Sequence, residues 1–198
     1  MQERSAARVG RMLDACAALV DELGYEGLTT TLIAQRAGVA IGSVYQFFPD
    51  KRAVVQALTV RHLESFLENL NTRLDARLGG GGKPDDWWDI VDAVIDEYIH
   101  MHRVEPGFKT LHFGDVVDVH LLDTDRENND VIAQRLQELI IDRLGFADRP
   151  RLRFALAIGV ETGDALINLA FRRDPEGDPE VLGEAKVLIR DYLSRHVD

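Results

Sequence analysis

The chain has a single cysteine and lacks any long uncharged stretch. One cysteine, Cys16, rules out an internal disulfide and any zinc module built on several cysteines. The longest run without a charged residue, Ala37–Pro49, has 13 residues and includes Ser, Tyr and Gln, so it is too short and too polar to span a bilayer. The first residues also lack the apolar core of a signal peptide. We therefore expect a cytoplasmic protein with no membrane partner.

Basic residues are in the minority. The 198 residues include 23 Lys and Arg against 34 Asp and Glu, for a formal net charge of −11. This balance excludes the uniformly basic surface on which non-specific nucleic-acid binding depends. The charge is uneven, however, because residues 1–52 hold six basic and six acidic side chains, which leaves the whole excess in residues 53–198. A local, neutral DNA-reading segment remains compatible with this distribution.

Apolar residues recur at three- and four-residue spacing between Gly and Pro breaks. Hydrophobic residues make up 45% of the chain, enough for a sizeable core. No segment alternates with period two for long enough to indicate a strand. The pattern predicts an all-α fold of about nine helices, the first ending at Gly24 and the last capped by Asp178. The expected ranges are about 4–23, 30–37, 41–47, 50–78, 84–103, 108–122, 125–144, 150–172 and 178–196.

Residues 28–51 predict two short helices joined by a glycine turn. Gly38 suits the left-handed conformation that a sharp turn between helices needs. This layout is that of a helix-turn-helix. The second helix begins with small side chains, which let its N-terminus approach base edges or phosphates. Donors for phosphate oxygens surround it: Thr29, Thr30, Thr31, Tyr45 and Lys51.

The same segment resembles the TetR family of bacterial transcriptional regulators. The residues that carry the resemblance are Gly24, Leu28, Thr29, Thr30, Ile33, Ala34, Ala37, Gly38, Val39, Gly42, Ser43, Tyr45, Phe48, Lys51 and Ala53. They cover the first quarter of the chain, and the remainder matches in length and helix count only. The resemblance implies a homodimer that binds a palindromic double-stranded DNA operator and is released by a small-molecule effector. It also implies a DNA-binding domain over 1–52 and a helical effector-binding and dimerisation domain over 53–198.

The resemblance further implies roles for single residues in the expected DNA-binding domain over 1–52, which we call the head. Those that would face DNA are Thr30, Thr31, Ile41, Gly42, Ser43, Tyr45, Gln46, Phe47 and Lys51. Among them, Ile41, Gly42, Ser43 and Gln46 would face the major groove, whereas Thr30, Tyr45 and Lys51 would hold phosphates and Thr31 would reach either. Two positions depart from the family pattern: Ala40 replaces a frequent Ser cap, and Phe47 replaces a Tyr or His. With fewer polar groups, we expect more reliance on thymine methyl contacts from Ile41 and on DNA shape.

The last two helices combine apolar faces with glycines, which fits close helix packing. The expected dimer interface comprises Leu156, Gly159, Gly163, Ile167, Val181, Ala185, Leu188 and Tyr192. Glycines in a helix cost about 1 kcal/mol each, a cost that a close contact would offset. Packing within one chain explains the same pattern, and some residues can serve both purposes.

A ligand pocket is expected between the middle helices. Its candidate residues are Phe66, Leu70, Trp88, Val91, Ile95, Tyr98, His102, Phe113 and Glu161. Each apolar member fits an ordinary core equally well. The carboxylate of Glu161 lies in a largely apolar helix, so it needs a partner, water or ligand.

Catalytic and metal-binding signatures are missing from the sequence. There is no nucleophile elbow, phosphate loop or cofactor fingerprint, and His100, His102, His112 and His120 lack the spacing of a helical zinc site. We therefore expect no enzyme activity, cofactor or metal. The favoured function is a ligand-responsive DNA-binding regulator, most simply a repressor. The alternatives are an all-helical carrier or enzyme whose helix-turn-helix is only packing, and a family member without ligand control.

Overall fold

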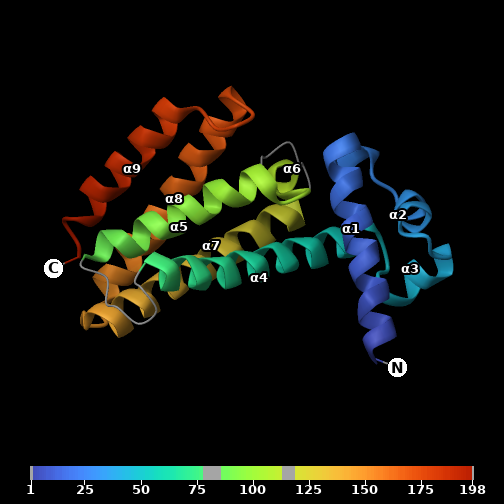
Figure 1. The fold of residues 1–198 in the computed structure, drawn as a ribbon, viewed down its shortest axis with the longest axis horizontal. Coiled ribbons are helices and arrows are strands. Elements are labelled where there is room, and N and C mark those ends of the chain that lie inside the picture. Colours follow the sequence, from blue (N-terminus) through green and yellow to red (C-terminus); the bar gives the residue numbers. More distant parts are fainter. Residues whose placement is uncertain (1, 78–85, 113–118, 198) are drawn as a thin grey trace. The chain divides into compact units, whose positions relative to one another are not determined.

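The computed structural model describes residues 2–77, 86–112 and 119–197. Within these ranges the chain is entirely helical apart from turns and short connections, which confirms the expected all-α fold (Figure 1). Nine helices are present there: α1 Gln2–Gly27, α2 Thr30–Ala37, α3 Ile41–Phe47, α4 Lys51–Arg77, α5 Trp87–Val104, α6 Phe108–His112, α7 Val119–Leu144, α8 Pro150–Arg173 and α9 Pro179–Leu193.

Side-chain caps begin two of these helices where the sequence indicates a start. Thr29 precedes α2, and its Oγ1 accepts a hydrogen bond from the Leu32 N–H at 3.2 Å. Asp178 precedes α9, and its Oδ1 accepts from the Glu180 N–H at 3.0 Å. Each cap satisfies an N–H group that has no partner within the helix. The predicted starts of these helices are confirmed.

The structure confirms one predicted helix end and corrects another. Gly24 interrupts the helical backbone with φ 69° and ψ 172°, as predicted, and a short helical stretch follows this kink to Gly27 within α1. Tyr25 and Leu28, which follow the kink, are buried, so this part of the chain packs into the core. At the other end of the chain, α9 stops at Leu193 rather than at residue 196. The predicted start of α5 at Pro84 lies outside the described residues, and α5 is described from Trp87.

The chain divides into two compact units. Unit 1 comprises residues 1–65 and 104–124, and unit 2 comprises residues 66–103 and 125–198. The predicted domain boundary after residue 52 lies within unit 1. In unit 1, Asp21 on α1 accepts hydrogen bonds from the Gly107 N–H at 2.8 Å and from the Thr110 hydroxyl at 2.9 Å. These hydrogen bonds hold α6 and the turn before it against α1.

Unit 2 contains the closely packed pair α8 and α9. Gly159 and Gly163 on α8 face side chains of α9: a Cβ atom built on Gly159 would lie 3.5 Å from Leu193, and one on Gly163 would lie 3.3 Å from Ile189. The two helices therefore approach closely because glycine leaves room for the larger side chains. By length and hydropathy α8 is also the helix, among those described, that could cross a membrane. Its buried residues pack inside unit 2, as those of a core helix do.

Candidate nucleic-acid interface and ligand cavity

The helix-turn-helix is built by α2, Gly38 and α3. Gly38 has φ 64°, in the left-handed region, and the Val39 N–H donates to the Ala34 carbonyl at 3.0 Å. Ile33 and Val44 are fully buried between the helices. Since glycine adopts this conformation without a Cβ clash, the turn and the small core together fix the angle between α2 and α3.

The outward face of α3 is apolar and uncharged. Ile41 is 40% exposed, Tyr45 54% and Phe47 37%, which is unusual for side chains of this size. Gly42 and Gln46 are also exposed, and a Cβ atom built on Gly42 would have no neighbour within 4 Å. This face therefore presents methyl, aromatic and amide groups, and a second surface can approach it closely at Gly42.

The donors expected to hold phosphates are already positioned around α3. The hydroxyls of Thr30 on α2 and Tyr45 on α3 are 3.1 Å apart and share a hydrogen bond. Lys51 donates from Nζ to the Tyr25 carbonyl at 3.0 Å, and its Nζ lies 4.4 Å from the centre of the Tyr25 ring. An ammonium group carries three N–H donors, so this contact orients Lys51 and leaves donors for another acceptor.

Other charges in unit 1 have local roles. Arg36 on α2 makes two hydrogen bonds to Glu22 on α1, at 2.8 and 2.7 Å. The hydrogen bond from Arg36 lowers the pKa of Glu22 below its ordinary value. Asp50 caps α4, since its Oδ1 accepts from the Ala53 N–H at 2.9 Å. These charges fix helices, whereas the outward face of α3 carries none.

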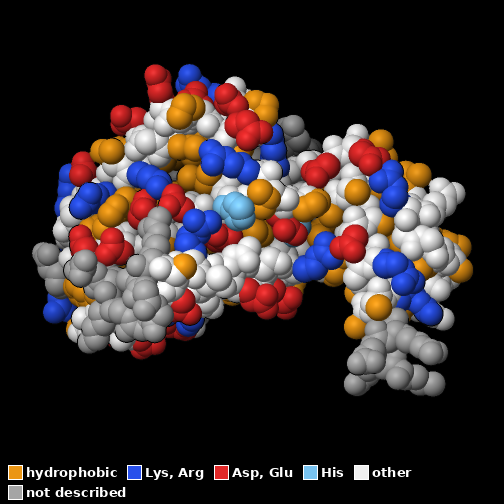
Figure 2. Space-filling model, in the orientation of Figure 1, with side chains coloured by type: hydrophobic (Ala, Val, Ile, Leu, Met, Phe, Trp, Pro, Cys, Tyr) orange, Lys and Arg blue, Asp and Glu red, His pale blue; other side chains and the backbone are white. Residues whose placement is uncertain are grey.

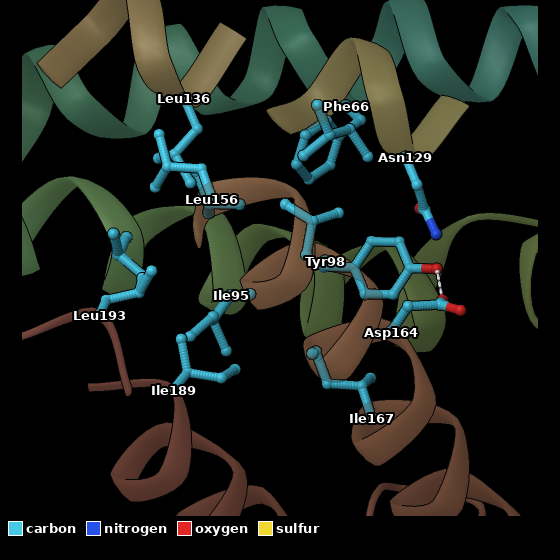
Figure 3. Close-up of a pocket in the computed structure, with 16 residues that line it drawn as sticks. Phe66, Ile95, Tyr98, Asn129, Leu136, Leu156, Asp164, Ile167, Ile189 and Leu193 are labelled. Carbon is cyan, nitrogen blue, oxygen red and sulfur yellow. Dashed lines mark hydrogen bonds between the residues drawn. The ribbon is translucent and has the colours of Figure 1, made fainter. Parts of the chain in front are cut away.

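Unit 2 contains a cavity of about 50 Å³ (Figure 3). Of the residues expected to form a ligand site, four line this cavity: Phe66, Val91, Ile95 and Tyr98. Leu70 is buried but does not line the cavity. Phe113 lies outside the described residues.

The three remaining candidates for the ligand site make other contacts. The guanidinium carbon of Arg190 lies over Trp88, 5.4 Å from the centre of the Trp88 ring. The Nδ1 atom of buried His102 lies 2.8 Å from the Tyr98 carbonyl oxygen. Glu161 is exposed and accepts a hydrogen bond from Asn129 at 3.3 Å. None of the three is among the residues that line the cavity.

Two polar residues that line this cavity, Asp164 and Asn129, were not predicted from the sequence. Asp164 on α8 lines it and accepts hydrogen bonds on Oδ1 from the Tyr98 hydroxyl at 2.6 Å and the Asn168 amide at 3.1 Å. Asn129 on α7 is a further polar lining residue. The available signal was an acidic residue next to Gly163, on the small-residue face of α8.

The residues expected to form a dimer interface fall into two groups. Within the chain, Leu156, Gly159, Gly163, Ile167 and Ala185 are buried. Val181 and Tyr192 are half-buried, and Leu188 is 52% exposed. The first group packs inside unit 2, so the surface available to a partner lies on the other side of these helices.

That outer side of α8 and α9 is also apolar. It exposes Phe154 (67%), Ile158, Leu169, Val187 and Leu188. Phe154 and Ile158 are four residues apart, which places them on one helix face. Apart from Leu188, this set was not predicted from the sequence, because α8 has a second and stronger apolar stripe. Figure 2 shows hydrophobic side chains open to solvent among the charged ones on the face in view.

Two family models match the chain. One, described as bacterial regulatory proteins of the tetR family, matches residues 12–58, which include α2 and α3. The other, described as the tetracyclin repressor-like C-terminal domain, matches residues 85–197, more than half of the chain. The chain belongs to the TetR family. Both the helix-turn-helix and most of the cavity lining fall within these matched TetR-family segments.

Solved structures of TetR-family proteins share this fold. The crystal structure of a TetR-family transcriptional regulator from Streptomyces coelicolor is 41% identical, with a TM-score of 0.77, over 96% of this chain and 99% of that one. The fatty acid degradation regulator FadR from Bacillus halodurans is 17% identical with a TM-score of 0.71, over 96% of this chain and 97% of that one. At that identity the likeness concerns the fold alone.

Curated relatives described as HTH-type transcriptional regulators match a shorter stretch. The transcriptional repressor KstR of Mycolicibacterium smegmatis is 34% identical over 82 residues, which is 41% of this chain and 38% of that protein. The chain thus spans less than half of the length of the curated relatives that it matches. These relatives are transcriptional regulators, and none of them favours the alternative of a carrier or an enzyme.

Proposed function

We propose that this TetR-family regulator is a repressor that binds a palindromic operator as a homodimer and is released by a small molecule. The observation that carries the proposal is the outward face of α3, with exposed Ile41, Tyr45 and Phe47 next to the donors of Thr30 and Lys51. A folded core does not require three large exposed side chains on a seven-residue helix. As a DNA-binding regulator the protein would act in the cytoplasm.

The head is proposed to divide its contacts between bases and backbone. Ile41, with Gly42, Ser43 and Gln46, would lie in the major groove, where methyl and amide groups distinguish base pairs. Thr30, Tyr45 and Lys51 would hold phosphates, which position the head without specifying sequence. Thr31 is exposed beside them.

Dimerisation is proposed through the outer faces of α8 and α9. Phe154 and Leu188 lose their solvent exposure when a second copy covers them, which burial of apolar area favours. A dimer with two heads suits a palindrome whose half-sites are one helical turn apart, about 34–36 Å. The effector is proposed to enter the cavity of unit 2 and to favour a different spacing of the heads, so that effector and operator oppose one another.

The full chain would first be used to select binding sequences from a random DNA duplex library. We expect two inverted half-sites whose centres are one turn apart. The affinity of the selected operator is then measured at several salt concentrations for the wild type and for Tyr45→Ala combined with Lys51→Ala. The double variant should bind all sequences more weakly, since phosphate contacts are lost, and its salt dependence should be shallower.

Tyr45→Phe, which removes the hydroxyl and keeps the ring, should also weaken binding, because the proposed phosphate contact is lost. Lys51→Ala alone, checked by thermal unfolding, separates a lost phosphate contact from a lost contact with Tyr25. If the double variant binds the operator as tightly as the wild type, the head is wrongly assigned. Selection of no sequence at all would refute the DNA-binding role.

A further inference from the structure

We propose that the cavity of unit 2 takes a small, largely apolar ligand that carries an ammonium group, which Asp164 recognises. This inference rests on the proposed effector site and specifies its chemistry. Of the sixteen described residues that line the cavity, thirteen are apolar or glycine and three, Tyr98, Asn129 and Asp164, are polar. That lining includes one carboxylate and no Lys, Arg or His.

The polar residues gather at one end of the cavity. Figure 3 shows Tyr98, Asp164 and Asn129 together on one side, and Leu136, Leu193 and Ile189 on the other. A ligand that fits this arrangement has a polar head and an apolar tail. Ligand sites commonly combine apolar walls with a few polar groups that fix orientation.

Donors at the polar end are already engaged with carboxylates. The Tyr98 hydroxyl and the Asn168 amide donate to Asp164, and the Asn129 amide donates to Glu161. The phenolic hydroxyl has only one hydrogen to donate, so its oxygen can act towards a ligand as an acceptor. Acceptors therefore outnumber donors at this end, which favours a head group that supplies hydrogen bonds, as an ammonium group does with three N–H donors.

Charge favours the same choice. Asp164 is the acidic residue among those that line the cavity, so an anionic head would meet its carboxylate. Within an apolar wall, charges interact more strongly than in water, because the local dielectric constant is lower. A carboxylate ligand would lose its hydration without gaining a cation, whereas an ammonium group gains an opposite charge.

The size of the cavity limits the ligand. About 50 Å³ is well below the several hundred Å³ of a typical ligand site. Entry of a ligand therefore requires the apolar walls to move apart, and a short-chain amine needs less displacement than a longer one. We therefore choose probes with one six-carbon tail and different heads: n-hexylammonium, 1-hexanol and hexanoate.

The experiment measures the dissociation constants of the three probes for the full-length protein by calorimetry. For the wild type we expect hexylammonium to bind at least tenfold more tightly than hexanol, and hexanoate to bind most weakly. Asp164→Asn keeps the shape of the side chain and should remove this preference. Asp191→Asn, which removes the same charge from an exposed position of α9, should preserve it. Tyr98→Phe should lower the preference less than Asp164→Asn does.

Hexanol or hexanoate binding as tightly as hexylammonium would overturn the inference. An unchanged preference in Asp164→Asn, or no binding of any probe, would also overturn it. Operator binding without any probe tests the proposed DNA-binding role separately. A protein that binds no DNA but prefers hexylammonium through Asp164 would refute that role and leave this inference standing.

Discussion

Replacing Ile41 by alanine should weaken operator binding by about thirtyfold. Ile41 is 40% exposed in the free protein, so roughly that share of its side chain remains for DNA to cover. Full burial of an isoleucine contributes about 1.5–3 kcal/mol, so the covered part contributes about 1 kcal/mol for each head and about 2 kcal/mol for the proposed dimer. A free-energy change of 1.4 kcal/mol corresponds to about tenfold in affinity.

The contact predicted for Ile41 is with a thymine methyl group, and the DNA can be changed to test it. Replacing single thymines of the selected operator by deoxyuridine removes one methyl group at a time. At the contacted thymine, the wild type should lose about 0.8 kcal/mol, the contribution of one buried carbon. Ile41→Ala should lose nothing further there, because its partner is already absent. Fluorescence anisotropy on all four combinations gives the interaction energy.

Val60→Ala is the matched control. Val60 is 48% exposed in the same unit but lies on α4, away from α2 and α3, so its replacement should leave operator affinity unchanged. Thermal unfolding should barely change in either variant, since neither side chain is buried. If deoxyuridine weakens the wild type and Ile41→Ala by the same factor at every thymine, Ile41 contacts no methyl group and the proposed readout is refuted.

Three further predictions concern stability and assembly. Gly107→Ala should lower the unfolding temperature, since Gly107 has φ +78° and an added Cβ would lie 3.1 Å from the α1 backbone. Gly10→Ala should instead stabilise the protein by about 1 kcal/mol, since an added Cβ would have no neighbour within 4 Å in a helix that favours alanine over glycine. Burial raises the pKa of Cys16 to about 12 from 9.0, so the unfolding free energy should fall as pH rises above 9.0. Urea titrations give the unfolding free energy at pH 8 and at pH 10. Between these two pH values it should fall by about 1.4 kcal/mol more in the wild type than in Cys16→Ala. A smaller difference would show that the thiol ionises in the folded state. Leu188→Glu should convert the proposed dimer to monomers, whereas Val131→Glu on α7 should not, and light scattering measures the mass of each variant. A dimeric Leu188→Glu protein would refute the interface.

Local chemistry made much of the fold predictable. Thr29 and Asp178 are followed by amides that their side chains can cap, and Gly38 is the residue that a left-handed turn favours. Such signals act over a few residues, so they can be read from the sequence alone. Gly24 shows their limit: the glycine predicts the break in α1, but burial of Tyr25 beyond it favours the short helical stretch that follows.

Contacts between distant residues were not predictable. Tyr98 and Asp164 are 66 residues apart, and only the packing of α5 against α8 brings their oxygens to 2.6 Å. The sequence therefore indicated Glu161, three residues earlier, which the structure places at the surface. Likewise the glycines of α8 suggest a close contact without stating whether it lies within one chain or between two. The structure places α9 of the same chain against them.

The glycine-mediated contact between α8 and α9 has a consequence for how the proposed dimer assembles. Because the two helices pack within one chain, the apolar groups at Phe154 and Leu188 are held on an ordered surface before a second copy arrives. Association then needs little ordering of the backbone, a cost that flexible partners must meet on binding. Newly made copies should pair at the rate at which two rigid surfaces meet in the correct orientation, about 10⁵–10⁷ M⁻¹s⁻¹. In a cell with few copies, the time to form a working dimer would then depend on how often two chains meet.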